Sequence, residues 1–369
     1  MTDKALDATV VIPVYNSAET LRRAVESVLR QTLANLELVI VDDGSRDASL
    51  MLAREVAETD ARIRVIALPE NRGKSYAMNR AVAEAKGRWI AVLDADDWYE
   101  RERLAVLVNA GDIADVPLVA DNQRFHDAAA GMDVGLAFRV EAGDARLDRD
   151  AFIKGCDPYA AFNFGMLKPL VRADFIHSNN LKYRENARLS EDFLYLVEFF
   201  GAGGTGLLLA QPLYNWTQSF GSITRQWTTT GAGAWRYDFN SALTANGDVL
   251  QALRERGDQA LAALLVHRMR AFQTLHHLNE INRSRAAGVG LPRLAAMIAG
   301  RPSVWPRLAL RALRYVTPHR GHHISVSSSE VKSYPNGAPD RGSKRSDALD
   351  NLAQSVHHAG VAKKTPYPG

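Results

Sequence analysis

Apolar and polar positions follow two alternating patterns along the first hundred residues. Short apolar runs rich in β-branched residues predict buried strands at 9–15, 36–41, 63–68 and 88–93. Between these runs, apolar residues recur at helical spacing. Helices are expected from 17–20 onward, after a cap at Asp47, and over 73–86 with Gly87 as the C-terminal stop. Strand and helix alternate strictly, which predicts a mostly parallel, right-handed α/β sheet with flanking helices.

The pattern becomes mixed after residue 100. Further strands are predicted at 116–120 and 207–214, a loop or weak hairpin at 123–144, and a helix at 189–200. From 232 to 314 the signal is helical, and one stripe carries Leu261, Leu264, Leu265, Arg268 and Phe272. Beyond 319 the chain has few apolar residues, which predicts a disordered tail. We therefore expect an α/β domain at 1–228, a helical C-terminal region at 229–318 and the tail at 319–369.

Composition narrows the class of protein. The chain has 369 residues, 46% of them hydrophobic, which suits a globular protein with a sizeable core. A net charge of only +3 gives no indication of a nucleic-acid partner. Cys156 is the only cysteine, which excludes a disulfide framework and makes a reducing cytoplasm the default location. The first residues contain no apolar signal core, and no run approaches the ~18 apolar residues of a membrane-spanning helix.

Two of the predicted strands end abruptly in carboxylates. Asp42 and Asp43 follow one strand, and Asp94, Asp96 and Asp97 follow another. Ligands of open α/β sheets bind at these carboxyl ends. Asp94 and Asp96 point the same way on an extended backbone, and such oxygen ligands suit Mg²⁺ or Mn²⁺ that shares its shell with substrate phosphates. The alternative at this position is a polar turn that caps the next helix.

Asp43 is a candidate for binding a nucleoside rather than a metal ion. Its carboxylate can accept hydrogen bonds from a nucleobase imide or a ribose hydroxyl, whereas the alternative is an Asx-turn. The segment 71–79 opens a helix with a glycine, and Arg72 and Lys74 favour an anion there. It lacks the upstream glycine of a Walker A loop, and the alternative is an ordinary helix start.

Two later motifs complete the candidate chemistry. Asp192 stands at the start of an amphipathic helix, where a carboxylate either caps the helix or acts as a general base. Ser222, Thr224 and Arg225 follow a predicted strand, and an arginine beside hydroxyls suits a diphosphate. The alternative for these three residues is a solvent-exposed loop.

Taken together and in this order, the motifs resemble family-2 inverting glycosyltransferases with the GT-A fold. The resemblance covers residues 8–228 and rests on the segments 11–16, 41–45, 71–73 with Asn79, 94–97 and 191–192. Residues 167–172, with Tyr183, look like bacterial succinoglycan-type exopolysaccharide glucosyltransferases. The resemblance implies a Rossmann-like catalytic domain and a hexosyltransferase that uses UDP-glucose or a similar UDP-hexose.

The resemblance also implies a role for each matching residue. Pro13, Tyr15 and Asp43 would hold the uracil end of the UDP-sugar, and Arg72 joins this donor-binding set. Asp94 would lie near the ribose, and Asp96 would ligate Mg²⁺ or Mn²⁺. Asp192 would be the catalytic base of an in-line displacement that inverts the anomeric centre, and Ser222, Thr224 and Arg225 would close over the diphosphate. The implied acceptor is a glycan, free or linked to a polyprenyl carrier.

One departure from a related group is informative. Processive polysaccharide synthases carry a Gln-x-x-Arg-Trp motif and transmembrane helices, whereas this chain has Thr224-Arg-Gln-Trp227 and no predicted span. The sequence therefore argues against a synthase that extrudes its polymer.

The segment 303–317 has an amphipathic pattern. Arg307, Arg311 and Arg314 share one helical face, and Trp305 lies on another. Such a helix can lie on an anionic membrane, here the inner face of the plasma membrane, and the alternative is a helix packed on the catalytic domain.

Two other functions compete with the glycosyltransferase interpretation. A non-catalytic nucleotide-sugar-binding protein would not need a base at Asp192. A nucleotidyltransferase would show a glycine-rich basic loop after the first strand, where residues 16–19 read Asn-Ser-Ala-Glu.

Overall fold

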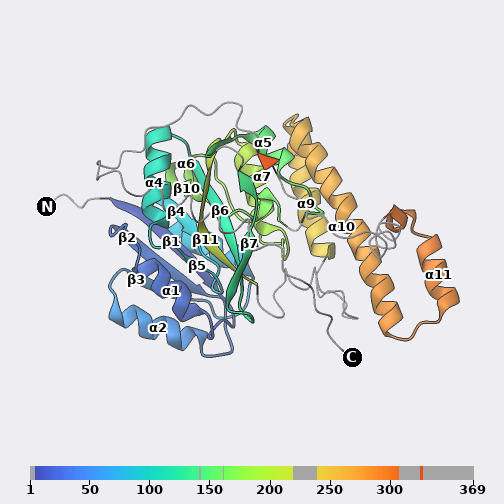
Figure 1. The fold of residues 1–369 in the computed structure, drawn as a ribbon, viewed down its shortest axis with the longest axis horizontal. Coiled ribbons are helices and arrows are strands. Elements are labelled where there is room, and N and C mark those ends of the chain that lie inside the picture. The colour runs from blue at the N-terminus through green and yellow to red at the C-terminus, as the bar shows by residue number, and fades with distance from the viewer. Residues whose placement is uncertain (1–4, 141–142, 161, 219–238, 307–324, 327–369) are drawn as a thin grey trace, which may run out of the picture. The chain divides into compact units, whose positions relative to one another are not determined.

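The computed structural model describes residues 5–140, 143–160, 162–218, 239–306 and 325–326. Most of its strands belong to one sheet (Figure 1), in the order β3-β2-β1-β4-β10-β6-β11-β5, with β7 beside β6 and β9 beside β11. The strands of this sheet are β1 (Leu6–Val14), β2 (Leu36–Asp42), β3 (Ile63–Ala67), β4 (Gly87–Val92), β5 (Trp98–Tyr99), β6 (Leu118–Asp127), β7 (Met132–Leu136), β9 (Ala145–Leu147), β10 (Leu170–Arg172) and β11 (Gly206–Gln218).

The first four strands are parallel, as the alternating pattern predicts. β1 pairs in parallel with both β2 and β4, and β2 pairs in parallel with β3. β10 then runs antiparallel to β4 and β6, while β11 is again parallel to β6. The sheet is therefore mostly parallel with antiparallel insertions. The carboxyl ends of β1, β2 and β4 lie together at one edge because these strands share a direction.

Alternation along β1 and β2 builds two cores, one on each face of the sheet. Val10 of β1 and Ile40 of β2 face one core, and Val11 and Val39 face the other. The first core is covered by α1 (Leu21–Leu29), α2 (Ser49–Thr59) and α4 (Arg103–Ala114); the second by α3 (Lys74–Glu84), α7 (Glu191–Gly201), α9 (Phe239–Glu255) and α10 (Gln259–Ala286). Strands that are buried on both faces have continuous apolar sequences, which is why these strands could be predicted from the sequence.

The predicted end of the third helix is wrong. Gly87 was expected to end the third helix, but α3 ends at Glu84 with Ala85 as its C-cap, and Gly87 is the first residue of β4. A Cβ atom at Gly87 would lie 2.2 Å from the backbone nitrogen of Thr9. The glycine is therefore required by close approach of β4 to β1 rather than by a helix end.

The region after residue 100 is more regular than predicted. β6 extends to Asp127, past the expected end at residue 120, and pairs antiparallel with β7, so the weak hairpin is confirmed. α5 (Arg149–Lys154), the short helix η1 (Phe164–Met166) and α6 (Ala173–Ser178) precede α7. Cys156 is free and buried.

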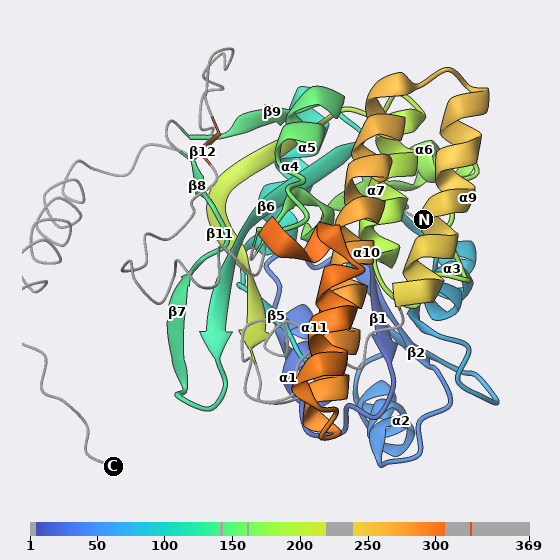
Figure 2. The ribbon, with the colours of Figure 1, turned by 90° about the vertical axis from the view of Figure 1, so that its right-hand side faces the viewer.

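The C-terminal region is helical as predicted. α9 and α10 pack side by side against α7 (Figure 2), and α11 (Leu291–Ala299) and η2 (Pro302–Val304) follow. The stripe from Leu261 to Phe272 is buried throughout, Arg268 included. No described helix is long and apolar enough to cross a membrane. Residues 325–326 form β12, which pairs in parallel with β8 (Arg139–Val140); otherwise the predicted tail lies outside the described residues.

Candidate active site

The acidic turn after β4 is anchored by its last carboxylate. Asp97 is 1% exposed and accepts hydrogen bonds from the Tyr214 hydroxyl (2.6 Å) and the Thr217 backbone N–H (2.7 Å), both on β11. Burial, followed by the neighbouring Asp96 and Asp94, raises the pKa of Asp97 well above its ordinary value. The turn does not cap α4, whose N-cap is Glu102 without a side-chain hydrogen bond. Asp97 therefore ties the turn to the sheet, and the capping alternative is not observed.

Asp96 differs from its neighbours because its carboxylate has no partner among the described residues. Only its backbone carbonyl is engaged: it accepts hydrogen bonds from Arg23 (Nη2, 2.6 Å) and from the Thr217 hydroxyl. Burial, and then the nearby charge of Asp94, raise the pKa of Asp96. The site therefore holds a partly buried carboxylate that makes no side-chain hydrogen bond or ion pair with a described residue, although the charges of Lys168 and Lys74 act on it from a distance.

Two lysines join Asp94 to Asp192. Lys168 Nζ lies 2.7 Å from Asp94 Oδ2 and 2.6 Å from Asp192 Oδ2. Lys74 Nζ lies 2.9 Å from Asp94 Oδ1, 3.1 Å from Asp192 Oδ2 and 3.5 Å from Glu191 Oε1. We call these five residues the charged cluster. It connects the end of β4, the start of α3, the segment before β10 and the first turn of α7.

The cluster sets the charge state of its carboxylates. Burial opposes ionisation of Asp192, but Lys168 and then Lys74 outweigh it and lower the pKa below its ordinary value. The same two lysines lower the pKa of Asp94 against the effect of burial. Glu191 goes the other way, because burial raises its pKa more than Lys74 lowers it. Of the two carboxylates in the first turn of α7, Asp192 is therefore the one whose ionised form the lysines favour.

The two oxygens of Asp192 have different surroundings. Both lysines contact Oδ2, whereas Oδ1 has no partner within the described part of the chain. Ser190, the N-cap of α7, makes no capping hydrogen bond with its side chain. The first turn of α7 thus presents a carboxylate with one oxygen that no described residue contacts, and its role as a general base stays a prediction.

Asp43 holds the loop that precedes α3. Its carboxylate accepts hydrogen bonds from the backbone N–H groups of Arg72 (2.8 Å) and Gly73 (2.8 Å), and it is 3% exposed. Asp42 accepts one from the Ser45 N–H (3.1 Å), which is a turn like the alternative considered above. These contacts join β2 to α3 beside the charged cluster. They leave the uracil role of Asp43 a prediction.

The remaining donor-side residues lie at the ends of the same elements. Tyr15 follows β1 and is 43% exposed, and Pro13 is a partly buried residue within β1. The Arg72 guanidinium stacks over the ring of Tyr76, 3.6 Å from its centroid. Ser222, Thr224 and Arg225 lie outside the described residues, so their place relative to the cluster stays a prediction.

The sequence analysis did not identify Lys168 as a site residue, and it predicted for Lys74 only that an anion would be favoured nearby. Lys168 lies in the segment 167–172, whose pattern served only the resemblance, and it is 9% exposed. A lysine placed directly before a buried strand was the available signal, because lysine is rarely buried unless it is paired.

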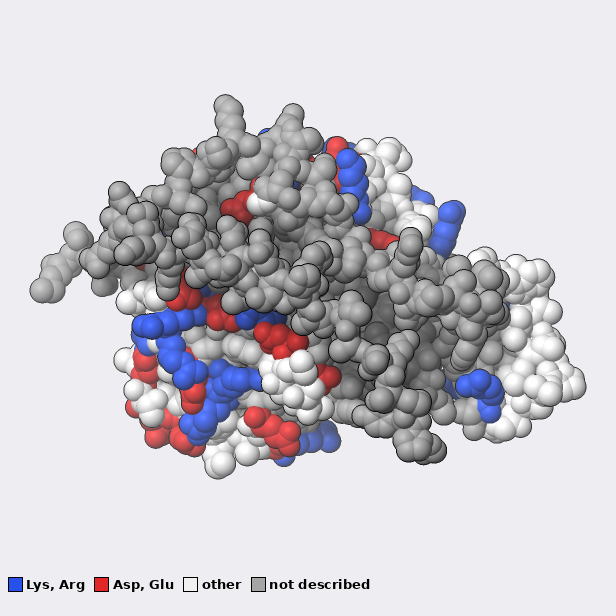
Figure 3. Space-filling model, in the orientation of Figure 1, with Lys and Arg blue, Asp and Glu red and all other residues white. Residues whose placement is uncertain are grey.

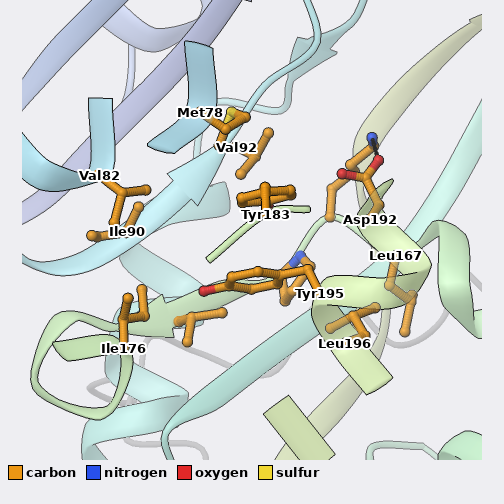
Figure 4. Close-up of a pocket in the computed structure, with 13 residues that line it drawn as sticks. Met78, Val82, Ile90, Val92, Leu167, Ile176, Tyr183, Asp192, Tyr195 and Leu196 are labelled. Atoms are coloured by element: carbon orange, nitrogen blue, oxygen red, sulfur yellow. Dashed lines mark hydrogen bonds and ion pairs between the residues drawn. The ribbon is translucent and has the colours of Figure 1, made fainter. Parts of the chain in front are cut away.

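An apolar cavity lies behind the charged cluster (Figure 4). Its volume is about 20 Å³, room for about one water molecule. Asp192 lies at one end, and the rings of Tyr183 and Tyr195 stack 4.3 Å apart along it. The cavity is too small for a sugar. Apart from Lys168 and Asp192, its lining consists of aliphatic, proline and tyrosine side chains.

The sequence predicted a divalent metal ion at Asp96. In the described part of the chain, no group of three or more His, Cys, Asp or Glu side chains could hold a metal ion by itself. Mg²⁺ in proteins is commonly held by one or two carboxylates together with substrate phosphates. The unpartnered carboxylate of Asp96 fits that mode, in which the protein contributes few ligands.

Charges of both signs lie on the described part of the N-terminal surface. On the face shown in Figure 3, basic and acidic side chains intermix over the described N-terminal region.

Comparisons with known proteins agree with the geometry. Residues 9–129 match the family model described as glycosyl transferase family 2. The succinoglycan biosynthesis protein ExoO of Rhizobium meliloti (strain 1021) is 32% identical over 93% of this chain and 98% of its own length. ExoU of the same organism is 37% identical over 51% of this chain and 55% of its own length. The crystal structure of residues 1–349 of S. aureus TarS in complex with UDP-GlcNAc superimposes with a TM-score of 0.58 at 17% identity, and the match covers 85% of this chain and 93% of that one.

Proposed function

This chain belongs to the family-2 glycosyltransferases, and we propose that it moves a hexosyl group from a UDP-sugar to a hydroxyl of a growing exopolysaccharide unit with inversion of configuration. Family membership decides against a nucleotidyltransferase and a non-catalytic binding protein. The observation that carries the inverting mechanism is the free Oδ1 of Asp192, an ionised carboxylate beside the acidic turn of β4.

The proposed donor is a UDP-hexose, for which UDP-glucose is the first choice. TarS, which shares the fold, is described in complexes with UDP-GlcNAc and with UDP, and both superimpose on this chain with TM-scores above 0.5. Pro13, Tyr15, Asp43 and Arg72 lie at or near the carboxyl ends of β1 and β2 and would bind the nucleotide. Ser222, Thr224 and Arg225 would cover the diphosphate.

The base works on the acceptor. The acceptor hydroxyl attacks the anomeric carbon from the face opposite the UDP, and Asp192 takes its proton as the new bond forms. Lys168 and Lys74 hold Oδ2, so Oδ1 is the oxygen that receives the proton. A single displacement needs no covalent intermediate on a second carboxylate. One displacement inverts the anomeric centre, by the stereochemical logic that applies to glycosidases.

A divalent cation is part of this proposal. Asp96 would hold Mg²⁺ or Mn²⁺ together with the donor diphosphate, and Asp94 would lie near the ribose. The cation would stabilise the negative charge that develops on the departing UDP. Asp97 keeps the turn in place through Tyr214 and Thr217, and the backbone carbonyl of Asp96 is held by Arg23 and Thr217.

The acceptor and its location follow from the relatives and the C-terminal region. ExoO is named for succinoglycan biosynthesis, and a polyprenyl-linked glycan acceptor would place the enzyme at the inner face of the plasma membrane. Trp305 is 54% exposed, while Val304 packs with Leu278 and Ile281 of α10. Arg307, Arg311 and Arg314 of the proposed membrane-binding segment 303–317 lie outside the described residues.

A donor screen tests the proposed function. Purified protein is incubated with UDP- and GDP-sugars and Mg²⁺ or Mn²⁺, and slow donor hydrolysis and thermal stabilisation are measured. We expect one UDP-hexose to be hydrolysed and to raise the melting temperature, and Asp192→Asn to keep the stabilisation while losing the turnover. Stabilisation by GDP-sugars alone would overturn the proposed donor. Anomeric configuration of the transferred sugar, read by NMR, tests inversion.

A further inference from the structure

Arg268 is a buried cation in the apolar stripe of α10. It is 8% exposed, and its guanidinium lies over the rings of Phe193 (3.9 Å to the centroid) and Phe272 (4.8 Å). Within the described part of the chain, no carboxylate forms an ion pair with it, and its Nε has no hydrogen-bond partner. Burial lowers the pKa of Arg268 to about 10. An apolar side chain of equal length would fill this space without desolvating a charge, so packing alone does not account for an arginine.

The described hydrogen bond of Arg268 reaches the residue before α7. Its Nη2 donates to Ser190 Oγ over 3.1 Å. Ser190 has φ 73° and ψ 20°, the left-handed conformation that non-glycine residues adopt rarely and mostly where the surroundings enforce it. A serine at this position ordinarily caps the helix with its hydroxyl, but the Ser190 side chain makes no such bond. The hydroxyl is turned toward α10 instead.

These contacts bracket the proposed base. Arg268 binds the residue immediately before Glu191 and Asp192 through its hydrogen bond, and it covers Phe193, the residue immediately after them, through its guanidinium face. Both contacts come from one side chain of the C-terminal helical region. The residues on both sides of Glu191 and Asp192 are thereby contacted by one side chain of α10.

We propose that Arg268 is a positioning residue, which holds Ser190 in the left-handed conformation and so aims Asp192 Oδ1 at the acceptor hydroxyl. The proposal rests on the proposed role of Asp192 as base. Small misplacements of a reacting group reduce rate far more than they reduce binding. The effect is therefore expected in kcat, with donor affinity and the folded structure preserved.

Matched variants separate positioning from packing. Arg268→Met keeps the length of the side chain and its contact with Phe193 but removes the hydrogen bond, and Ser190→Ala removes the acceptor of that bond. Arg268→Lys keeps a donor. Arg270→Met, on the exposed side of the same helix, is the control for an arginine loss on α10. For each variant we would measure kcat, donor KM, UDP affinity and the melting temperature.

We expect Arg268→Met and Ser190→Ala each to lower kcat about tenfold or more, with UDP affinity within twofold of wild type. The double variant should lose no more than the larger single loss, because both changes remove one interaction. Arg268→Lys should recover part of the rate, and Arg270→Met should match wild type.

Several results would overturn the proposal. These are a wild-type kcat in folded Ser190→Ala, single losses that multiply in the double variant, or a parallel loss of UDP affinity. If Arg268→Met does not fold, Ser190→Ala carries the test alone, since it removes one hydroxyl. Asp192→Asn in the same assay distinguishes failure of the proposed base from failure of the positioning proposal. If Asp192→Asn is active, Asp192 is not the base. If Asp192→Asn is inactive and Ser190→Ala is fully active, only the positioning role of Arg268 is refuted.

Discussion

Replacing Asp192 with asparagine removes the proposed base while keeping its shape. An amide can still contact Lys168 and Lys74 through its oxygen, but it cannot take the acceptor proton. General-base catalysis contributes about 10²–10⁴-fold, so transfer should fall by this factor. That corresponds to about 3–5 kcal/mol of activation free energy.

The structure also bounds the cost in stability. After the change, Lys168 keeps Asp94 at 2.7 Å, and Lys74 keeps Asp94 at 2.9 Å and Glu191 at 3.5 Å. Neither lysine is left without an anion. The loss in unfolding free energy should therefore stay below the ~3–5 kcal/mol that follows removal of the sole partner of a buried charge.

Three measurements decide the matter. Initial transfer rates with saturating UDP-sugar give the kcat ratio, titration calorimetry with UDP gives donor affinity, and urea unfolding gives stability. Glu191→Gln is the matched control, because among the described residues the ion-pair partner of Glu191 is Lys74, at 3.5 Å, and burial raises the pKa of Glu191. We expect a much smaller rate loss in the control. Normal transfer by Asp192→Asn would refute the reasoning, and Glu191 would be the next candidate.

Four further outcomes are expected. Asp96→Ala should abolish transfer and EDTA should do so reversibly, whereas full activity in EDTA would remove the metal from the mechanism. Lys168→Met should raise the pKa of Asp192, because Lys168 lowers it in the wild type. The base acts when it is ionised, so activity falls as the pH falls through this pKa, and the acid limb of the kcat/KM profile should move to higher pH. An unmoved limb would contradict the assigned base. Arg103→Met should lower the unfolding free energy by about 3–5 kcal/mol in urea titrations, because Asp121, 2% exposed and 2.7 Å from Arg103, loses its ion-pair partner. Arg88→Met, which removes an exposed ion pair, should lower it by less than about 1 kcal/mol. Equal losses in the two variants would refute this prediction. Liposome flotation should weaken in an Arg307/Arg311/Arg314→Glu variant, by about 1 kcal/mol per arginine at low salt, and equal flotation of both proteins would leave 303–317 without a membrane role.

The sequence by itself was enough for the α/β domain and for the order of its motifs. Apolar periodicity is a local property, so β1 to β4, α3 and α7 were predictable within a few residues. Asp94 and Asp96 were identifiable as candidates because they follow an apolar run, and Asp192 because it begins an amphipathic helix. The antiparallel insertion of β10 was not predictable, since three residues carry too little pattern to state a direction.

Only the tertiary structure decided which charges meet. Lys74 and Asp192 are 118 residues apart in the chain but in contact, and Lys168 joins both Asp94 and Asp192. Asp97 proved to be hydrogen-bonded to β11, and Arg268 to Ser190. Pairing of this kind depends on where strands and helices pack, and the free energy of a charge depends on burial and on its neighbours. Periodicity specifies which face of an element is buried, but not which side chain of another element will lie against it.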